Sequence, residues 1–181
     1  VSRADLIVEN GGGYDSFIDA LIDATGTDAH VITAVEFSHD WPENTGHSDE
    51  EPAEEEPAEG DHDHDHGDHG HVEGFNEHVW YGPHTMEHVA EAIAEELTEL
   101  SPADAAAFET NLDEFTAGIA ELEASLATLD SAHGGTEIFV TEPVPLYLTD
   151  AAGLVNVAPE AFTEAVEEGQ DVPPATRLEA L

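Results

Sequence analysis

The stretch "ADLIVENGGGYDSFIDALIDATG" (residues 4–26), together with "HVITAVEF" at residues 30–37, decides the fold class. The apolar run at residues 6–8 predicts a short strand, and the glycines that follow it predict a turn. The next apolar side chains share one helical face: Phe17, Ile18, Leu21 and Ile22. Residues 30–37 are rich in β-branched side chains and predict a second strand. Strand, helix and strand in this order indicate a parallel α/β unit.

Two further helices are predicted after residue 85. The first has apolar residues at helical spacing: Met86, Val89, Ile93, Leu97 and Leu100. It ends at "LSPAD", where Ser101 can cap a helix and Pro102 can begin the next one. The second carries a narrow apolar seam: Phe108, Leu112, Phe115, Ile119, Leu122, Leu126 and Leu129. Such a seam suits either a coiled-coil partner or a helix that lies across two lobes.

A second strand and helix pair is predicted near the end of the chain. The segment "HGGTEIFVTEPV" (residues 133–144) predicts a glycine turn and a strand at residues 138–141. The segment "PLYLTDAAGL" predicts an amphipathic helix that ends at Gly153. Residues 159–181 are helical in pattern with a break at Pro173 and Pro174. Because the chain starts next to a strand and stops inside a helical pattern, we interpret it as part of a longer protein.

The composition restricts the possible partners. Of 181 residues, 43 are acidic and 2 are basic, so the formal net charge is -41. This charge excludes binding to nucleic acid and to anionic membranes, and it makes cations the natural partners. Adaptation to a high-salt habitat can produce the same acidity. The chain has no cysteine, so any bound metal must sit on histidine and carboxylate. No apolar run approaches the roughly 20 residues of a membrane-spanning helix.

Residues 38–74 predict a disordered acidic insertion, because they are dominated by Asp, Glu, His, Pro and Gly. Within it, "DHDHDHGDHGH" (residues 61–71) carries five clustered histidines: His62, His64, His66, His69 and His71. We interpret them as a loop that collects metal, because imidazole is a good zinc ligand. A passive acidic metal buffer and an inert solvated loop are the alternatives. A zinc hydrolase is a further alternative, because one subset fits an H-x-H-x-D-H motif: His64, His66, Asp68 and His69.

His78 differs from the loop histidines. It lies in "NEHVWY", where apolar residues return, so the fold can fix its orientation. We therefore predict that His78 is a metal ligand, with a packing role as the alternative. His84 and His88 fall in the first helical turns, where the helix dipole disfavours a cation, and we interpret them as surface residues. Nothing in the ordered part pairs a nucleophile with a base, so no catalytic residue is predicted.

The order of these segments resembles the metal-specific solute-binding proteins of ABC importers, the zinc and manganese uptake family. Residues 2–21 resemble the family's "ADLVV.NG" segment, and "NEHVWYGPHT" resembles its "DPHVWLDP" motif. Residues 61–71 resemble the His-rich loop of its zinc branch, and residues 101–124 the start of its long backbone helix. "IFVTEPVPLYLTDAAGL" resembles the opening of the second lobe.

The resemblance implies a metal site. It places the family's second histidine ligand on His78 and its third ligand on Glu142, which keeps the family's spacing to Tyr147. The first and last ligands would lie before Val1 and after Leu181, and Gly82 stands where the family usually has Asp. An oxygen ligand at Glu142 favours Mn²⁺, whereas the His-rich loop favours Zn²⁺. We predict zinc, with manganese as the alternative.

The resemblance also implies an α/β fold with Rossmann-like parallel-sheet lobes joined by a long backbone helix. We expect a partial first lobe at residues 1–100, a connecting helix at 101–131 and a partial second lobe at 132–181. The implied function is that of an extracytoplasmic receptor, periplasmic or anchored at the cell surface, which captures metal and delivers it to an ABC permease. The expected partners are a metal ion and that permease. We expect a monomer that neither binds nucleic acid nor inserts into the membrane.

Overall fold

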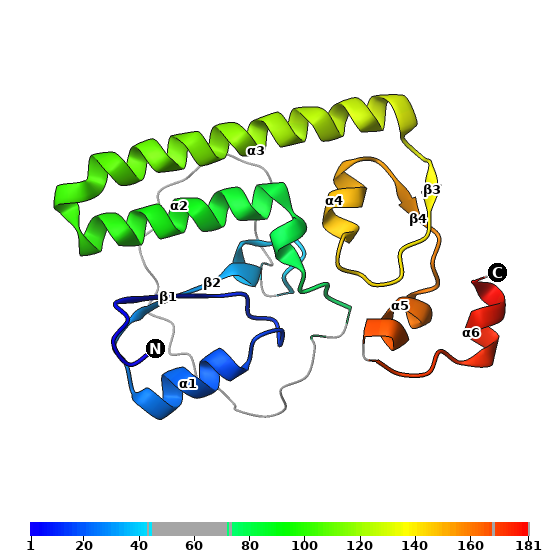
Figure 1. Ribbon diagram of the computed structural model, residues 1–181, viewed down its shortest axis with the longest axis horizontal. Coiled ribbons are helices and arrows are strands. Elements are labelled where there is room, and N and C mark those ends of the chain that lie inside the picture. The colour runs from blue at the N-terminus through cyan, green and yellow to red at the C-terminus, as the bar shows by residue number, and fades with distance from the viewer. Residues whose placement is uncertain (43, 45–71, 73, 168, 181) are drawn as a thin grey trace.

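The computed structural model describes residues 1–42, 44, 72, 74–167 and 169–180. Its first unit is a parallel pair, β1 (Leu6–Glu9) and β2 (His30–Thr33), connected through α1 (Phe17–Thr25). The register runs from Leu6 opposite His30 to Glu9 opposite Thr33. In Figure 1, α1 lies on one side of this sheet, and the next long helix lies on the other. The predicted parallel α/β unit is confirmed.

The second strand is shorter than predicted. It ends at Thr33 and continues as a 3-10 helix, η1 (Ala34–Phe37). The backbone N–H of Val35 donates to the Asn10 carbonyl at 3.0 Å, and both Ala34 and Val35 are buried. A bond to a distant residue therefore bends the chain into the core, against the local preference of β-branched residues for a strand.

Two long helices follow, α2 (Pro83–Leu100) and α3 (Ala105–His133), connected through the 3-10 helix η3 (Pro102–Asp104). Helix α2 contacts the sheet, and α3 packs on α2. Figure 1 shows them side by side, with α3 extending past α2 to the second unit. Ser101 stands at the predicted cap position and Pro102 begins η3, but the Ser101 side chain makes no capping bond. Its hydroxyl donates to the Asp104 carboxylate at 2.8 Å and caps no backbone N–H.

The second unit repeats the parallel pairing on a smaller scale. Strands β3 (Glu137–Ile138) and β4 (Val155–Asn156) pair in parallel, and α4 (Leu146–Ala151) lies between them in sequence. Helices α5 (Glu160–Glu167) and α6 (Pro174–Glu179) follow, and the predicted break falls at Pro173 and Pro174. The described residues thus form a helix-rich, mixed α/β fold with two small parallel sheets.

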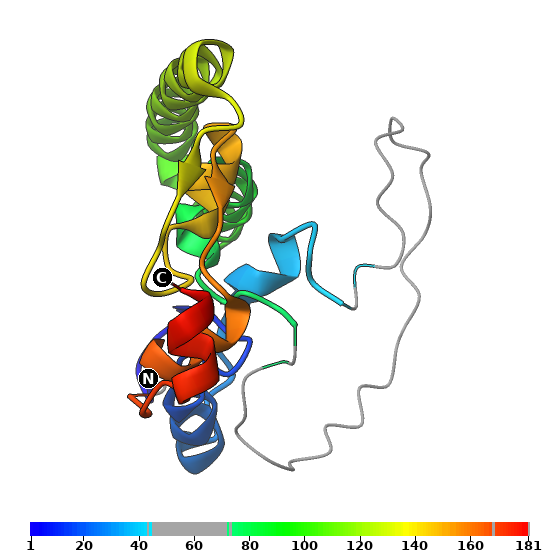
Figure 2. The same cartoon turned by 90° about the vertical axis from the view of Figure 1, so that its right-hand side faces the viewer.

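The core joins the chain on both sides of the acidic insertion. Its buried members are Ala34, Val35, Phe75, Val79 and Val89. Residues 38–42 belong to the fold and not to a disordered insertion as predicted, because Ser38 is buried and Trp41 packs edge-on against Phe75 with ring centroids 5.0 Å apart. Residues 45–71, which hold the predicted metal-collecting histidines and the hydrolase motif, lie outside the described residues. In Figure 2, α3 lies at one end of the molecule and α1 and α6 at the other.

The predicted apolar faces are only partly covered. Helix α1 has no buried residue, and the Phe17 side chain is 63% exposed. On α3, Leu126 is buried, whereas Phe115 and Leu129 are exposed. The predicted α3 seam therefore packs against α2 and α4 without being buried along its full length. None of the described helices combines the length and the apolar character needed to cross a membrane.

Gly11 can be tested as the residue that permits the turn after β1. Its φ is +77°, and a Cβ atom would overlap Cγ2 of Thr33. Gly26 also has a positive φ, +55°, but a Cβ there meets open space. Gly11→Ala should lower the free energy of unfolding by roughly 2–4 kcal/mol, because it combines backbone strain with overlap. Gly26→Ala should cost only about 1–2 kcal/mol. Equal losses in urea titrations would contradict this assignment.

Glu9 provides a second test. It is 8% exposed, Thr33 donates to its Oε1 at 3.1 Å, and its Oε2 accepts no hydrogen bond from the described residues. Burial raises the pKa of Glu9, and the nearby Asp19 raises it further. A raised pKa means that the folded state holds this proton more tightly than the unfolded state. Ionisation of Glu9 therefore lowers the free energy of unfolding, and this loss is complete above the folded-state pKa. The loss disappears as the pH falls to the ordinary pKa of an unfolded glutamate, about 4.3.

The measurable consequence is a pH-dependent difference between the wild type and Glu9→Gln. Urea unfolding between pH 7 and pH 4 should show the wild type gaining stability relative to the variant as the pH falls. Glu137→Gln, at an exposed position on β3, controls for the removal of one negative charge from a strongly acidic chain. A difference that stays constant across this range would refute the assigned cost.

Candidate metal centre

His78 is held between two core residues. Phe75 and Val79 are both buried in the core cluster, so the backbone of the residues between them is fixed. His78 directly precedes the 3-10 helix η2 (Val79–Tyr81) and is itself only 5% exposed. The prediction that the fold fixes this ring where apolar residues return is confirmed by its burial.

Asn76 orients the His78 ring. Its side-chain oxygen accepts from the His78 backbone N–H at 3.2 Å and lies 2.7 Å from Nδ1 of the ring. Its amide nitrogen donates to the Pro143 carbonyl at 3.1 Å, which establishes which end of the amide faces the histidine. Nδ1 therefore carries a proton, and Nε2 is the ring nitrogen that points away from Asn76.

The second ring nitrogen of His78 pairs with a carboxylate. Nε2 of His78 lies 3.2 Å from Oε1 of Glu167 on α5. Two donor atoms that share one tetrahedral zinc ion are separated by roughly 3.3 Å, given metal–ligand distances of about 2.0–2.2 Å. A lone pair and a carboxylate oxygen at this distance repel each other unless a proton or a metal cation lies between them. Sequence reasoning did not identify Glu167, because no motif marks it.

These two side chains border an acidic cavity of about 480 Å³. Four carboxylate side chains line it in addition to His78: Glu77, Glu160, Glu164 and Glu167. This lining attracts cations. Among the described residues, however, no three His, Asp or Glu side chains converge closely enough to hold a metal ion together. The arrangement supplies one oriented nitrogen and nearby oxygens, without a closed coordination shell.

Glu142 is close to this cavity in sequence but does not line it. Its side chain is exposed, whereas the next residue, Pro143, borders the cavity and accepts the Asn76 bond. The Tyr147 hydroxyl donates to the Asn76 carbonyl at 2.8 Å. Burial raises the pKa of Tyr147, so this hydroxyl keeps its proton at neutral pH. The structure thus brings the segment after Glu142 close to His78. The role of Glu142 as a metal ligand stays a prediction.

Two aromatic rings pack against His78, and the loop after β1 bonds the neighbouring residue Glu77. The Tyr14 and Trp80 rings meet the His78 ring edge-on, with centroids 5.8 Å and 5.0 Å away. The Asn10 amide donates to the Glu77 carbonyl at 2.8 Å. Asp15 accepts the backbone N–H of Asn10, also at 2.8 Å. Sequence reasoning missed Asn10, Asp15 and Asn76. Polar residues at the carboxyl end of a parallel strand were the available signal for Asn10.

An oriented imidazole in an acidic cavity, on a fold of short parallel strands and covering helices, fits the class of α/β solute-binding proteins. The family model described as "Zinc-uptake complex component A periplasmic" matches residues 1–181. The chain belongs to this family. The family is a non-enzymatic family of solute-binding proteins. That no residue of this chain is catalytic stays a prediction. A search of curated protein sequences gives no match.

Solved structures support the same fold. A crystal structure of ZnuA shares 19% identity with a TM-score of 0.61, over 97% of this chain and 56% of that chain. A zinc-bound ZnuA with residues 138–173 deleted, in its own numbering, shares 21% identity with a TM-score of 0.59, over 86% and 50%. Zn(II)-bound AdcA from Streptococcus pneumoniae shares 19% with a TM-score of 0.61, over 88% and 29%. The chain thus spans about half the length of the two ZnuA structures, and identities this low establish the fold alone.

The role of Asn76 can be tested by NMR of the imidazole nitrogens. In the wild type, Nδ1 of His78 should appear as a protonated, slowly exchanging nitrogen, because the Asn76 oxygen accepts its hydrogen. Asn76→Ala should remove this protection and redistribute the proton between the ring nitrogens. Asn156→Ala is the matched control, because the Asn156 side-chain oxygen also accepts two N–H groups, both from the backbone, but belongs to the second unit. An unchanged His78 spectrum in Asn76→Ala would refute the assigned tautomer.

Proposed function

We propose that this chain is part of an extracytoplasmic receptor that captures Zn²⁺ and delivers it to the permease of an ABC importer. The observation that carries the proposal is the His78 ring, whose Nδ1 is held by Asn76 and whose Nε2 faces an acidic cavity. Membership of the zinc-uptake family supports the same function. Binding and release of an ion need no bond-breaking chemistry, so no catalytic group takes part.

Zinc fits these donors better than manganese does. Imidazole nitrogen suits zinc, whereas manganese prefers sites made of oxygen. Two relatives of similar fold, a ZnuA variant and AdcA, hold zinc in their crystal structures. We therefore propose zinc as the cargo, with manganese as the alternative if oxygen ligands dominate the complete site.

We propose His78 and Glu142 as two ligands of this site. Glu142 directly precedes Pro143, whose carbonyl is bonded to the amide that also orients His78. One residue of extended chain spans only about 3.3–3.6 Å, so a small rotation of the backbone before Pro143 would bring Glu142 toward the cavity. The neighbouring Glu167 would then balance the charge of the ion or act as a further oxygen donor.

The remaining parts of the receptor follow from this assignment. We propose that His62, His64, His66, His69 and His71 collect zinc reversibly and raise its concentration near the cavity. The two small sheets would belong to two Rossmann-like lobes, at residues 1–100 and 132–181, with the connecting helix at 101–131 between them. The receptor would act as a monomer outside the cytoplasm, with a membrane permease as its protein partner.

Zinc titration of the full-length protein tests this function. Deletion of residues 59–71 should leave one tight site, because the proposed ligands His78 and Glu142 lie outside the loop. In that background, His78→Ala should weaken zinc binding by more than about 100-fold, since even outer-shell partners are worth about 10–100-fold. Glu142→Ala should weaken it by roughly 10-fold or more. The measurement is calorimetry in competition with a chelator.

His30→Ala is the matched control for the histidine substitution. His30 also pairs with a carboxylate, that of Glu96, but lies on β2 away from the cavity. Its removal should leave the tight site unchanged. If deletion of residues 59–71 abolished all zinc binding, the protein would instead be a passive metal buffer or a loop-based zinc hydrolase.

A further inference from the structure

We propose that His84 and His88 form a second, exposed metal site that takes a divalent ion of the zinc, copper and nickel class. The two histidines lie one turn apart on α2, at positions i and i+4. Their Nε2 atoms are 3.2 Å apart, and their rings meet nearly at right angles with centroids separated by 4.5 Å. This site is separate from the proposed His78 centre and does not depend on it.

The separation of the two nitrogens suits a shared ion. Zinc binds imidazole nitrogen at about 2.0–2.1 Å, so two nitrogens on one tetrahedral ion lie roughly 3.3 Å apart. The observed 3.2 Å is therefore close to the distance required by bidentate coordination. Without metal, the same distance is explained by one ring donating an N–H to the other. Metal binding would replace this hydrogen bond, and the Nε2 proton of His84 would move through exchange with solvent to Nδ1 of the same ring, so that both rings bind as neutral imidazoles.

Glu91 orients the His88 ring for metal binding. Its Oε2 lies 2.9 Å from Nδ1 of His88 and can accept the hydrogen carried there. The Nδ1–H then points at the carboxylate, and Nε2 points at His84. Carboxylates that accept the second N–H of a histidine fix its tautomer and increase its basicity as a ligand. The arrangement therefore resembles the outer shell of a metal site rather than a chance contact between exposed rings.

His84 is constrained as well. The His39 ring stacks on it with centroids 4.9 Å apart and an angle of 6° between the planes. On this side, His84 borders an open cavity of about 420 Å³ whose lining includes Asp40, Glu123 and Asp130. Because no three potential ligands converge among the described residues, water must complete the coordination shell from this cavity. A site with two protein nitrogens and water ligands should be weak and should exchange metal quickly.

The helix dipole does not prevent binding. It disfavours a cation near a helix N-terminus by typically 0.3–1 kcal/mol at an exposed position, which is less than a tenfold change in affinity. The sequence-based interpretation of His84 and His88 as plain surface residues relied on this small effect. Bidentate coordination outweighs it, because the second imidazole binds at an effective concentration in the millimolar range. The chain's net charge of -41 attracts cations in addition.

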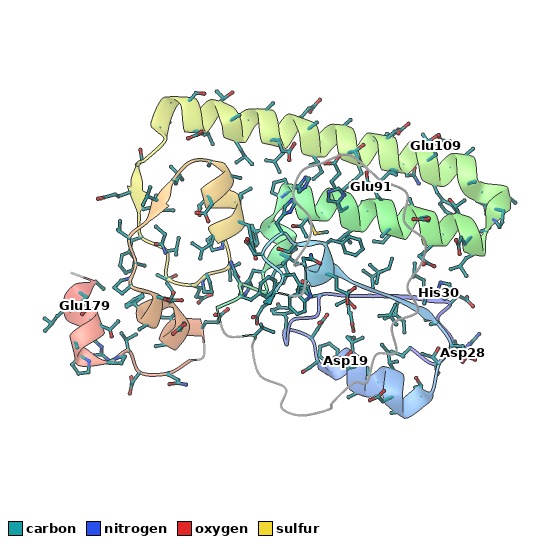
Figure 3. The ribbon with its side chains drawn as sticks, turned by 180° about the vertical axis from the view of Figure 1, so that it is seen from behind. Asp19, Asp28, His30, Glu91, Glu109 and Glu179 are labelled. Carbon is teal, nitrogen blue, oxygen red and sulfur yellow. The ribbon has the colours of Figure 1, made fainter. Side chains whose placement is uncertain are left out.

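Calorimetry with Zn²⁺ tests the site in a full-chain variant that lacks the other predicted histidine ligands. In this parent, His62, His64, His66, His69 and His71 are changed to Ser, and His78 to Ala. It should still bind one zinc ion. Adding His84→Ala or His88→Ala should weaken this binding at least roughly tenfold, and Glu91→Ala should weaken it by about tenfold. His30→Ala is the matched control for the two histidine substitutions. His30 also pairs with a carboxylate, but it lies on β2, away from Glu91 and the proposed site on α2 (Figure 3).

NMR of the unsubstituted protein provides a second measurement that does not rely on the multiple variant. Zn²⁺ should shift the Nε2 signals of His84 and His88 together, while Nδ1 of His88 stays protonated. The proposal is overturned if these signals do not move at saturating zinc, or if His84→Ala binds zinc as tightly as the parent. The NMR measurement follows only the rings of His84 and His88, and the calorimetric parent lacks His78. Either failure would therefore leave the proposed receptor function untouched.

Discussion

The amide of Asn76 connects parts of the chain that are far apart in sequence. It bonds the His78 ring two residues away and the Pro143 carbonyl 67 residues away. The carbonyl of the same residue accepts the Tyr147 hydroxyl. Phe75 and Val79 are buried in the core on either side of Asn76 in sequence. The Asn76 bond therefore fixes the segment before α4 relative to the core. This one side chain bonds both His78 and Pro143, which line the cavity from the two units.

The strong acidity makes the placement of each carboxylate important. A chain with a net charge of -41 is destabilised by self-repulsion unless its charges are solvated or screened. Most described carboxylates are exposed, but Glu9 is buried, and burial raises its pKa. Both histidine arrangements place an imidazole nitrogen next to a carboxylate oxygen, at Glu167 and at Glu91. A bound divalent cation would lower the local repulsion at either place.

The regular elements could be predicted because their signal is local. Apolar periodicity marked β1, α2 and α3, and proline and glycine marked the break before α6 and the end of α4. The end of β2 was missed because the Val35–Asn10 bond that bends the chain is not local. Asn76 was missed for the same reason, since an isolated asparagine in a sequence does not reveal three partners. His84 and His88 lie at the surface, as predicted, but the sequence analysis considered the helix dipole and not the i, i+4 spacing on which the proposed second site depends.

The thirteen residues from Asn76 to His88 hold two contrasting histidine environments. At His78, a neutral amide accepts the ring N–H and the ring is buried, so orientation is gained without adding charge. At His88, a carboxylate accepts the ring N–H, and the side chain is 41% exposed. Burial slows exchange of a bound ion with solvent, whereas exposure and only two nitrogens favour fast exchange. An imidazole ligand would thus suit retention of a metal ion at His78 and transient capture at His88. The difference arises from the burial of each ring and from the group that accepts its N–H.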